Sequence, residues 1–180
     1  HLIPATIDGK AMHNVQNAMF AAAICYSMGS TLEDIRQGLR TFATSYFQAP
    51  GRLNVFDEHP FKVILDYGHN PAAIEAMTKL CTQLEPKGKR IICFSMPGDR
   101  RDEDIVAAAE IVAGKFDHYI CKADDGRRGR GNSEVPDLLR ETLIENGVEA
   151  SQIQVIPDEV SAVDATLAMG TVDDLVLIFG

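Results

Sequence analysis

The residues best placed to do chemistry lie where an apolar segment gives way to a turn. Val63–Leu65 is an apolar run, and Asp66, His69 and Asn70 follow it, ahead of Pro71. The run predicts a buried strand, and Pro71 suits the first turn of a helix, where its missing N–H would have no intrahelical partner. The three polar residues would then lie at the carboxyl end of a strand, which is the edge at which open α/β sheets bind ligands.

Arg52 lies a short way upstream, in the run Ala49-Pro50-Gly51-Arg52. Its planar guanidinium could bind a phosphate through two parallel hydrogen bonds. Asp66 could accept hydrogen bonds from ribose hydroxyls or orient a metal ion. The structural alternatives are that Arg52 is an ordinary surface arginine and that Asp66 only caps the following helix.

Asn14 and Asn17 are three residues apart at the start of a predicted helix, so both amides can project from one face. A side-chain amide has donors and an acceptor, which suits it to the edge of an adenine base. The structural alternative is that Asn14 is only a helix N-cap and that the neighbouring His13 is a surface residue.

Two charged segments follow later predicted strands at the same edge. One is the run Gly98–Asp104, and the other is the Gly/Arg-rich run Lys122–Gly131. The helix dipole alone would account for the acids, and a Gly/Arg-rich segment is often only a mobile loop. Arginines in both runs could instead hold a carboxylate or a phosphate. The candidate substrate-binding residues are Asp99, Arg100, Arg101, Asp102, Arg128 and Arg130.

The elements that must position these residues alternate along the chain. Apolar runs predict strands at 53–56, 61–65, 90–95, 118–121, 154–156 and 174–179, and helical patterns predict helices at 71–85, 102–115, 133–146 and 158–169. The first two strands flank a turn and predict a hairpin. Strands that alternate with helices form βαβ units, so the predicted fold is α/β with a doubly wound, mostly parallel, Rossmann-like sheet.

Residues 1–48 show a different pattern. A helix is predicted from Asn14 to about Gly29 and a shorter one from Leu32 to about Thr41, followed by a linker. Two helices without a sheet cannot bury a core of their own. We therefore expect residues 1–48 to be the end of a preceding domain, 49–180 to be a separate domain, and the chain to be a piece of a larger protein.

Composition narrows the class of protein. Hydrophobic residues make up 46% and charged residues 24% of the 180 positions, which are ordinary values for a globular domain. A net charge of −9 without a basic stripe argues against a nucleic-acid partner. No stretch approaches the roughly 20 apolar residues of a membrane span. Four cysteines without a CxxC pair predict reduced core thiols and a cytoplasmic protein.

The motifs together resemble those of Mur-type amide ligases, in order and over essentially the whole chain. They are His13–Ala18, Pro50–Arg52, Leu65–Pro71 and the two charged segments, and the charged segments are most similar to the cyanophycin synthetase branch. The resemblance implies that ATP is bound by Asn14, Asn17, Arg52 and Asp66. It also implies catalytic roles for Arg52 and His69, a substrate-lining role for Asn70, and substrate specificity in the charged segments.

The resemblance further implies a reaction in which ATP activates a carboxylate as an acyl phosphate, which the α-amine of an amino acid then attacks. In the cyanophycin synthetase branch, arginine is added to the side chains of a poly-aspartate acceptor. Upstream central and ATP-grasp domains of the same polypeptide would be partners, with Mg²⁺ held mainly there, and a homo-oligomer is expected. The alternatives are a folylpolyglutamate or peptidoglycan type of ligase and a non-catalytic Mur-like binding or assembly module.

One motif of this family is missing from these residues. No G-x-x-x-x-G-K-[ST] phosphate loop occurs in the sequence, and no dinucleotide fingerprint follows any predicted strand. In Mur-type ligases the phosphate loop belongs to the central domain. The chain is therefore expected to carry part of an ATP site and to be inactive alone.

Overall fold

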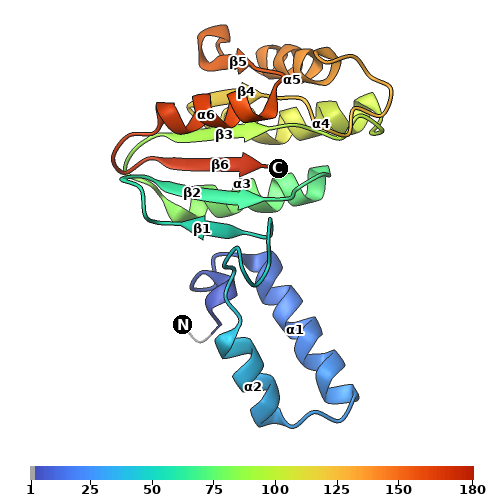
Figure 1. Ribbon diagram of the computed structural model, residues 1–180, viewed down its shortest axis with the longest axis vertical. Helices are drawn as coiled ribbons and strands as arrows, with labels where there is room; N and C mark the ends of the chain where they lie inside the picture. Colours follow the sequence, from blue (N-terminus) through green and yellow to red (C-terminus); the bar gives the residue numbers. More distant parts are fainter. Residues whose placement is uncertain (1–2) are drawn as a thin grey trace.

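A computed structural model describes residues 3–180 and shows a six-stranded sheet with helices on both faces (Figure 1). The strands are β1 (Asn54–Phe56), β2 (Lys62–Asp66), β3 (Arg90–Phe94), β4 (His118–Cys121), β5 (Ile153–Val155) and β6 (Leu175–Phe179). Their order across the sheet is β1-β2-β6-β3-β4-β5. The hairpin pair β1 and β2 is antiparallel and every other pair is parallel, so the predicted doubly wound, mostly parallel sheet is confirmed.

Helices cover the two faces unequally. The first face carries three helices, which are α3 (Pro71–Leu84), α4 (Asp102–Val112) and α5 (Glu134–Glu145), while the second carries α6 (Glu159–Met169) (Figure 1). Ile74, Ile105 and Leu139 pack in the first core, and Ala162 packs in the second. Because both faces of the central strands are buried, their sequences are continuous apolar runs rather than alternating ones.

The predicted strands and helices after residue 50 are all present. The largest difference in their ends is at α4, which ends at Val112 rather than 115. Gly114 follows in the left-handed region at φ 68°, where the helix cannot continue. Two short 3-10 helices, η1 (Pro4–Thr6) and η2 (Ala150–Gln152), were not predicted because they have no apolar period.

The helical segment lies beside the β1 edge of the sheet and consists mainly of α1 (Met12–Ser27) and α2 (Leu32–Thr41) (Figure 1). Neither helix buries a side chain. On α1, Met19 and Phe20 are each 68% exposed. These observations agree with the expectation that two helices cannot form a core of their own.

Three of the four cysteines are buried, as predicted, and one is not. Burial raises the pKa of Cys81 to about 12 and that of Cys93 to about 11, and it also raises the pKa of Cys121. Cys25 is exposed, so its assignment to the core was wrong, because it lies on α1, a helix with no buried side chain. Within residues 3–180, no helix is long and apolar enough to cross a membrane.

Candidate functional site

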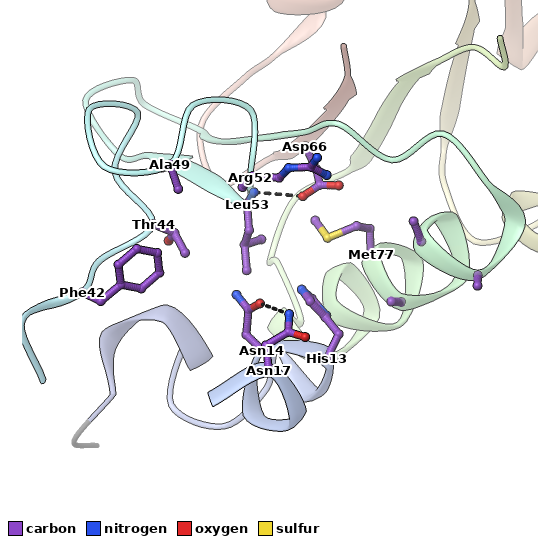
Figure 2. Close-up of a pocket in the computed structure, with 13 residues that line it drawn as sticks. His13, Asn14, Asn17, Phe42, Thr44, Ala49, Arg52, Leu53, Asp66 and Met77 are labelled. Carbon is purple, nitrogen blue, oxygen red and sulfur yellow. Dashed lines mark hydrogen bonds between the residues drawn. The ribbon is translucent and has the colours of Figure 1, made fainter. Parts of the chain in front are cut away.

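A cavity of about 590 Å³ lies between the start of α1 and the β2–α3 part of the sheet (Figure 2). Its polar lining comes from separate parts of the chain: His13, Asn14 and Asn17 from α1, Arg52 from the turn before β1, and Asp66 from the end of β2. Leu53 and Met77 add apolar surface. The four residues predicted to bind a nucleotide therefore line one cavity.

The end of β2 supplies the cavity with a carboxylate that has no capping role. Asn70 is the N-cap of α3, and its Oδ1 accepts a hydrogen bond of 2.9 Å from the Ala73 N–H. Pro71 occupies the first turn, as predicted. The interpretation of Asp66 as a helix cap is therefore wrong. Asn70 and His69 do not line the cavity, and the proposed roles of both in substrate binding and catalysis stay predictions.

Asp66 is held by the backbone opposite it. Its Oδ2 accepts a hydrogen bond of 2.9 Å from the Leu53 N–H. Burial raises the pKa of Asp66, and this effect is opposed by the Leu53 N–H and by the charges of His13, Arg52 and His69. The Asp66 carboxylate is thus half-buried, and burial outweighs the neighbouring groups that favour its charged form. Its oxygens are suited to accept hydrogen bonds from hydroxyls of a ligand.

The turn that carries Arg52 is fixed to the same strand end. The Tyr67 N–H donates a hydrogen bond of 2.7 Å to the Gly51 carbonyl, and the Gly51 N–H donates one of 2.7 Å to Oδ1 of the fully buried Asn54. The Arg52 guanidinium lies 5.2 Å from the centre of the Tyr67 ring, a cation–π contact. In the described part of the chain no carboxylate forms an ion pair with Arg52, so its charge is available to a ligand.

The two asparagines lie side by side on α1. Asn17 Nδ2 donates to Asn14 Oδ1 at 3.1 Å (Figure 2), and Asn14 Nδ2 donates to the Ala5 carbonyl at 2.8 Å. Because α1 begins at Met12 and its N-cap is Ala11, the interpretation of Asn14 as an N-cap is wrong. Asn17 keeps its carbonyl oxygen and one amide hydrogen for a ligand.

His13 is a cavity residue that sequence reasoning did not select. It lines the cavity with the asparagines, and burial lowers its pKa against the opposing charge of Asp66. The imidazole is therefore mainly neutral at pH 7. The signal that could have identified it was its place in the His-Asn-x-x-Asn run, one residue before Asn14.

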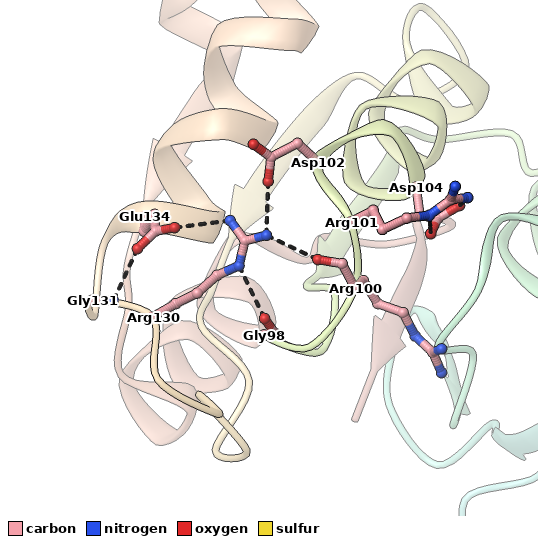
Figure 3. A network of polar contacts seen from close by, with 8 residues as sticks. All are labelled: Gly98, Arg100, Arg101, Asp102, Asp104, Arg130, Gly131 and Glu134. Carbon is pink, nitrogen blue, oxygen red and sulfur yellow. Dashed lines mark hydrogen bonds and ion pairs between the residues drawn. The ribbon is translucent and has the colours of Figure 1, made fainter.

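The predicted substrate-binding residues of the charged segments form a second group, outside the cavity. They lie in the loops that follow β3 and β4, with Asp102 as the first residue of α4, at the same edge of the sheet as Asp66. Arg101 donates two hydrogen bonds of 3.1 Å to Asp104, and Arg128 forms an ion pair with Asp99. Arg130, in the loop after β4, donates to the Gly98 and Arg100 carbonyls in the loop after β3 (Figure 3). Most of these arginines are thus paired within the protein.

Metal-binding groups are not gathered in the same way. Across residues 3–180, no cluster of three or more His, Cys, Asp or Glu side chains is arranged to hold a metal ion. Amides, a carboxylate, an imidazole and a guanidinium around one cavity are instead a donor and acceptor set that fits a nucleotide.

The sequence is similar to that of several amide ligases. It is 37% identical over 177 residues to the cyanophycin synthetase of Crocosphaera subtropica, covering 98% of this chain and 20% of that protein. It is also 37% identical over 178 residues to the cyanophycin synthetase of a Synechocystis strain, with 99% and 20% covered. The chain thus spans about a fifth of the length of these relatives.

Solved structures of related ligases have the same fold. Escherichia coli FolC in complex with ADP, without folate substrate, matches with a TM-score of 0.70 and 26% identity, over 91% of this chain and 36% of that chain. MurC of Thermotoga maritima matches with a TM-score of 0.66 over 93% of this chain and 34% of that chain, and at 18% identity it shows the fold alone. The family model described as "Mur ligase, glutamate ligase domain" matches residues 51–180. The chain therefore belongs to the Mur ligase family.

Proposed function

We propose that the cavity between α1 and β2 binds the nucleotide of an ATP-dependent acid–amino-acid ligase, of which these 180 residues are the C-terminal part. One observation carries this proposal: Asn14, Asn17, Arg52 and Asp66, which come from three separate motifs, line a single cavity. The names of the similar proteins support it, since they are ligases, and the similar FolC structure contains ADP.

Each cavity residue has a role that its chemistry supports. The amides of Asn14 and Asn17 would bind the edge of the adenine, and Asp66 would accept hydrogen bonds from the ribose hydroxyls. Arg52 would bind phosphate oxygens, and its cation–π contact with Tyr67 would hold it in place. His13, as a neutral imidazole, would contribute a wall of the cavity.

We further propose that the substrate pair is that of a cyanophycin synthetase, with arginine added to aspartate side chains. In this reaction ATP converts the acceptor carboxylate into an acyl phosphate, and the α-amine of arginine displaces phosphate to form the amide. Arg52 would offset charge that develops on the transferring phosphoryl group. The charged loops after β3 and β4, with His69 and Asn70, would face the substrates.

The remaining parts of the enzyme would lie in the upstream polypeptide. Residues 1–48 would complete a central domain that holds Mg²⁺ and the phosphate loop, and 49–180 would be the C-terminal domain. An ATP-grasp domain would precede them, and the whole would form a homo-oligomer. The isolated chain would hold part of the ATP site and would not ligate.

A second candidate is a ligase of the folylpolyglutamate type. The observation in its favour is the structural similarity to FolC, with a TM-score of 0.70. The 37% identity to cyanophycin synthetases over 98% of the chain favours the first candidate. The two candidates differ in the amino acid that drives turnover, arginine in the first and glutamate in the second.

The test is amino-acid-dependent phosphate release by the full-length protein with a poly-aspartate primer. Arg52→Ala and Asp66→Ala should each lower kcat/KM for ATP by roughly 100-fold, the scale expected when a group that binds the reacting phosphates or orients the nucleotide is lost. Arg140→Ala on α5 and Asp164→Ala on α6 remove exposed side chains of the same type outside the cavity and should change it little.

Three results would contradict parts of the proposal. Turnover with glutamate but not arginine would make the substrate assignment wrong. Equal activity of the cavity variants and their controls would make the site assignment wrong. If no amino acid stimulates phosphate release, the chain is better described as a non-catalytic Mur-like module.

A further inference from the structure

The loops after β3 and β4 touch each other through their backbones. Gly98, in the first loop, is buried, and a Cβ atom at this position would overlap the carbonyl oxygen of Arg127 in the second. Only a residue without a side chain permits this approach. The two loops therefore form one surface at the carboxyl edge of the sheet.

Arg130 connects the two loops through hydrogen bonds from all three of its guanidinium nitrogens (Figure 3). Nε donates to the Gly98 carbonyl at 2.9 Å, and Nη2 donates to the Arg100 carbonyl at 2.8 Å and to Asp102 Oδ1 at 2.7 Å. Nη1 donates to Glu134 Oε1 at 2.8 Å. Four of its five N–H groups are used and two carboxylates match its charge, so Arg130 has little left to bind a substrate directly.

Arg100 is in the opposite situation. Its carbonyl is held by Arg130, and its side chain extends away on the other side of the backbone (Figure 3). Its Nε is buried and has no hydrogen-bond partner among residues 3–180. No carboxylate of the described chain forms an ion pair with it. A buried guanidinium N–H without a partner is costly, which favours a site where a ligand supplies the missing acceptor.

We propose that Arg130 is a positioning residue that fixes the backbone of Arg100, so that the Arg100 guanidinium can bind an oxyanion of the substrates. The oxyanion is either the α-carboxylate of the incoming amino acid or a phosphate of the nucleotide. This inference rests on the proposed ligase function. Its physical basis is that a charged group held before the ligand arrives loses less entropy on binding.

The experiment measures KM for arginine and KM for ATP separately in the full-length protein. Arg100→Ala should raise one of these constants by roughly 10-fold or more, as expected for a lost hydrogen bond to a charged group. Arg130→Ala should raise the same constant by a smaller factor, on the order of 5-fold, and should leave the other unchanged. In the double variant the two increases in KM should not multiply, because Arg130 acts only through the contact between Arg100 and the oxyanion.

The amide of arginine, which lacks the α-carboxylate, identifies the oxyanion. If Arg100 binds the carboxylate, wild type and Arg100→Ala should have similar KM values for the amide. If it binds phosphate, only KM for ATP changes. Arg140→Ala, an exposed arginine outside the loops, is the control and should leave both constants unchanged.

The proposal is wrong if Arg130→Ala leaves both constants unchanged, or if its effect multiplies with that of Arg100→Ala. An equal change in every constant would show a merely structural role. If Arg130→Ala does not fold, Asp102→Asn removes one of the anchors of Arg130 and should raise the same constant as Arg100→Ala, by a smaller factor. Absence of any arginine-dependent turnover in the wild type would instead contradict the proposed function.

Discussion

The cavity and the two charged loops lie at the same end of the sheet but use their polar residues in opposite ways. In the cavity, Arg52 contacts an aromatic ring and forms no ion pair within residues 3–180, although its charge acts on the Asp66 carboxylate. Asp66 accepts a backbone hydrogen bond on one oxygen, which leaves the other oxygen for other donors. In the loops, Arg101, Arg128 and Arg130 are each paired with an acid. Residue type alone does not distinguish a group that binds a ligand from one that binds its own protein.

The two regions should therefore differ in which property a substitution of a charged residue changes. A charge paired within the protein should show its loss as lower stability, while a charge that faces a cavity should show it as weaker ligand binding. Four sets of substitutions compare the two regions on stability, measured as the free energy of unfolding in urea.

The largest expected effect concerns Lys122, which begins the loop after β4. Its side chain is 2% exposed, and its Nζ lies 3.2 Å from Oε1 of Glu159, which is 32% exposed. Glu159→Gln leaves a buried ammonium without a counter-charge and should destabilise the chain by about 3 kcal/mol. Lys122→Met leaves only a carboxylate that water can reach, and it should cost clearly less. Equal losses would contradict this asymmetry.

Gly98→Ala should have the next largest effect. The added methyl group would overlap the Arg127 carbonyl, so the two loops must separate, at a cost of about 2 kcal/mol. Gly131→Ala is the matched control, since no atom lies within 4 Å of its Cβ position and its φ is not in the left-handed region. If Gly98→Ala proves as stable as the control, the loops are not in backbone contact.

Arg130→Ala compared with Arg52→Ala tests the two regions against each other directly. Removing Arg130 leaves the buried Gly98 carbonyl without its donor and should cost about 2 kcal/mol. Removing Arg52 takes away an exposed cation–π contact and a favourable charge near Asp66, and should cost about 0.5 kcal/mol. For the ATP affinity of the full-length protein, Arg52→Ala should have the larger effect and Arg130→Ala the smaller. If Arg130→Ala has the larger effect on both stability and ATP affinity, the proposed difference between the two regions is wrong.

Asp66→Asn should give the smallest change in stability, and its sign is the informative part. Burial raises the pKa of Asp66 in the folded state, so the folded protein binds this proton more tightly than the unfolded chain. Its contribution to stability is complete below the unfolded pKa and is lost as pH rises through the folded pKa. At pH 7 the variant should therefore be more stable than wild type. The difference should shrink toward pH 4, and a variant less stable at pH 7 would contradict this account.

Much of the fold could be predicted because parallel strands that are buried on both faces have continuous apolar sequences. Examples are Arg90–Phe94 and Leu175–Phe179. Helices between such strands indicate βαβ units, whose crossover connections are right-handed. The order of the strands could not be predicted. β6 lies between β2 and β3. This position depends on packing across the whole sheet, and the hydrophobic pattern of a single segment does not indicate it.

The cavity was predictable in part. The position of the charged loops at the sheet edge was predicted, but the pairings within them were not. Asn14, Asn17, Arg52 and Asp66 were selected from motifs, but their convergence depends on how α1 meets β2, which the motifs do not encode. The pairing of Arg130 depends on loop conformations at Gly98 and Arg100, more than 25 residues away in sequence. Sequence patterns contain no signal for such contacts.

The two hydrogen bonds that fix the turn of Arg52 to the end of β2 have a consequence for regulation. They make one wall of the cavity a single rigid body that carries both Arg52 and Asp66. The other wall, α1, buries no side chain of its own; its N-cap Ala11 packs in the core, and residues 28–53, which include α2, connect it to β1. The affinity of a ligand that contacts both walls therefore depends on the position of α1 relative to the sheet. By thermodynamic linkage, a contact on the exposed face of α1 that shifts this placement changes ligand affinity without touching the ligand.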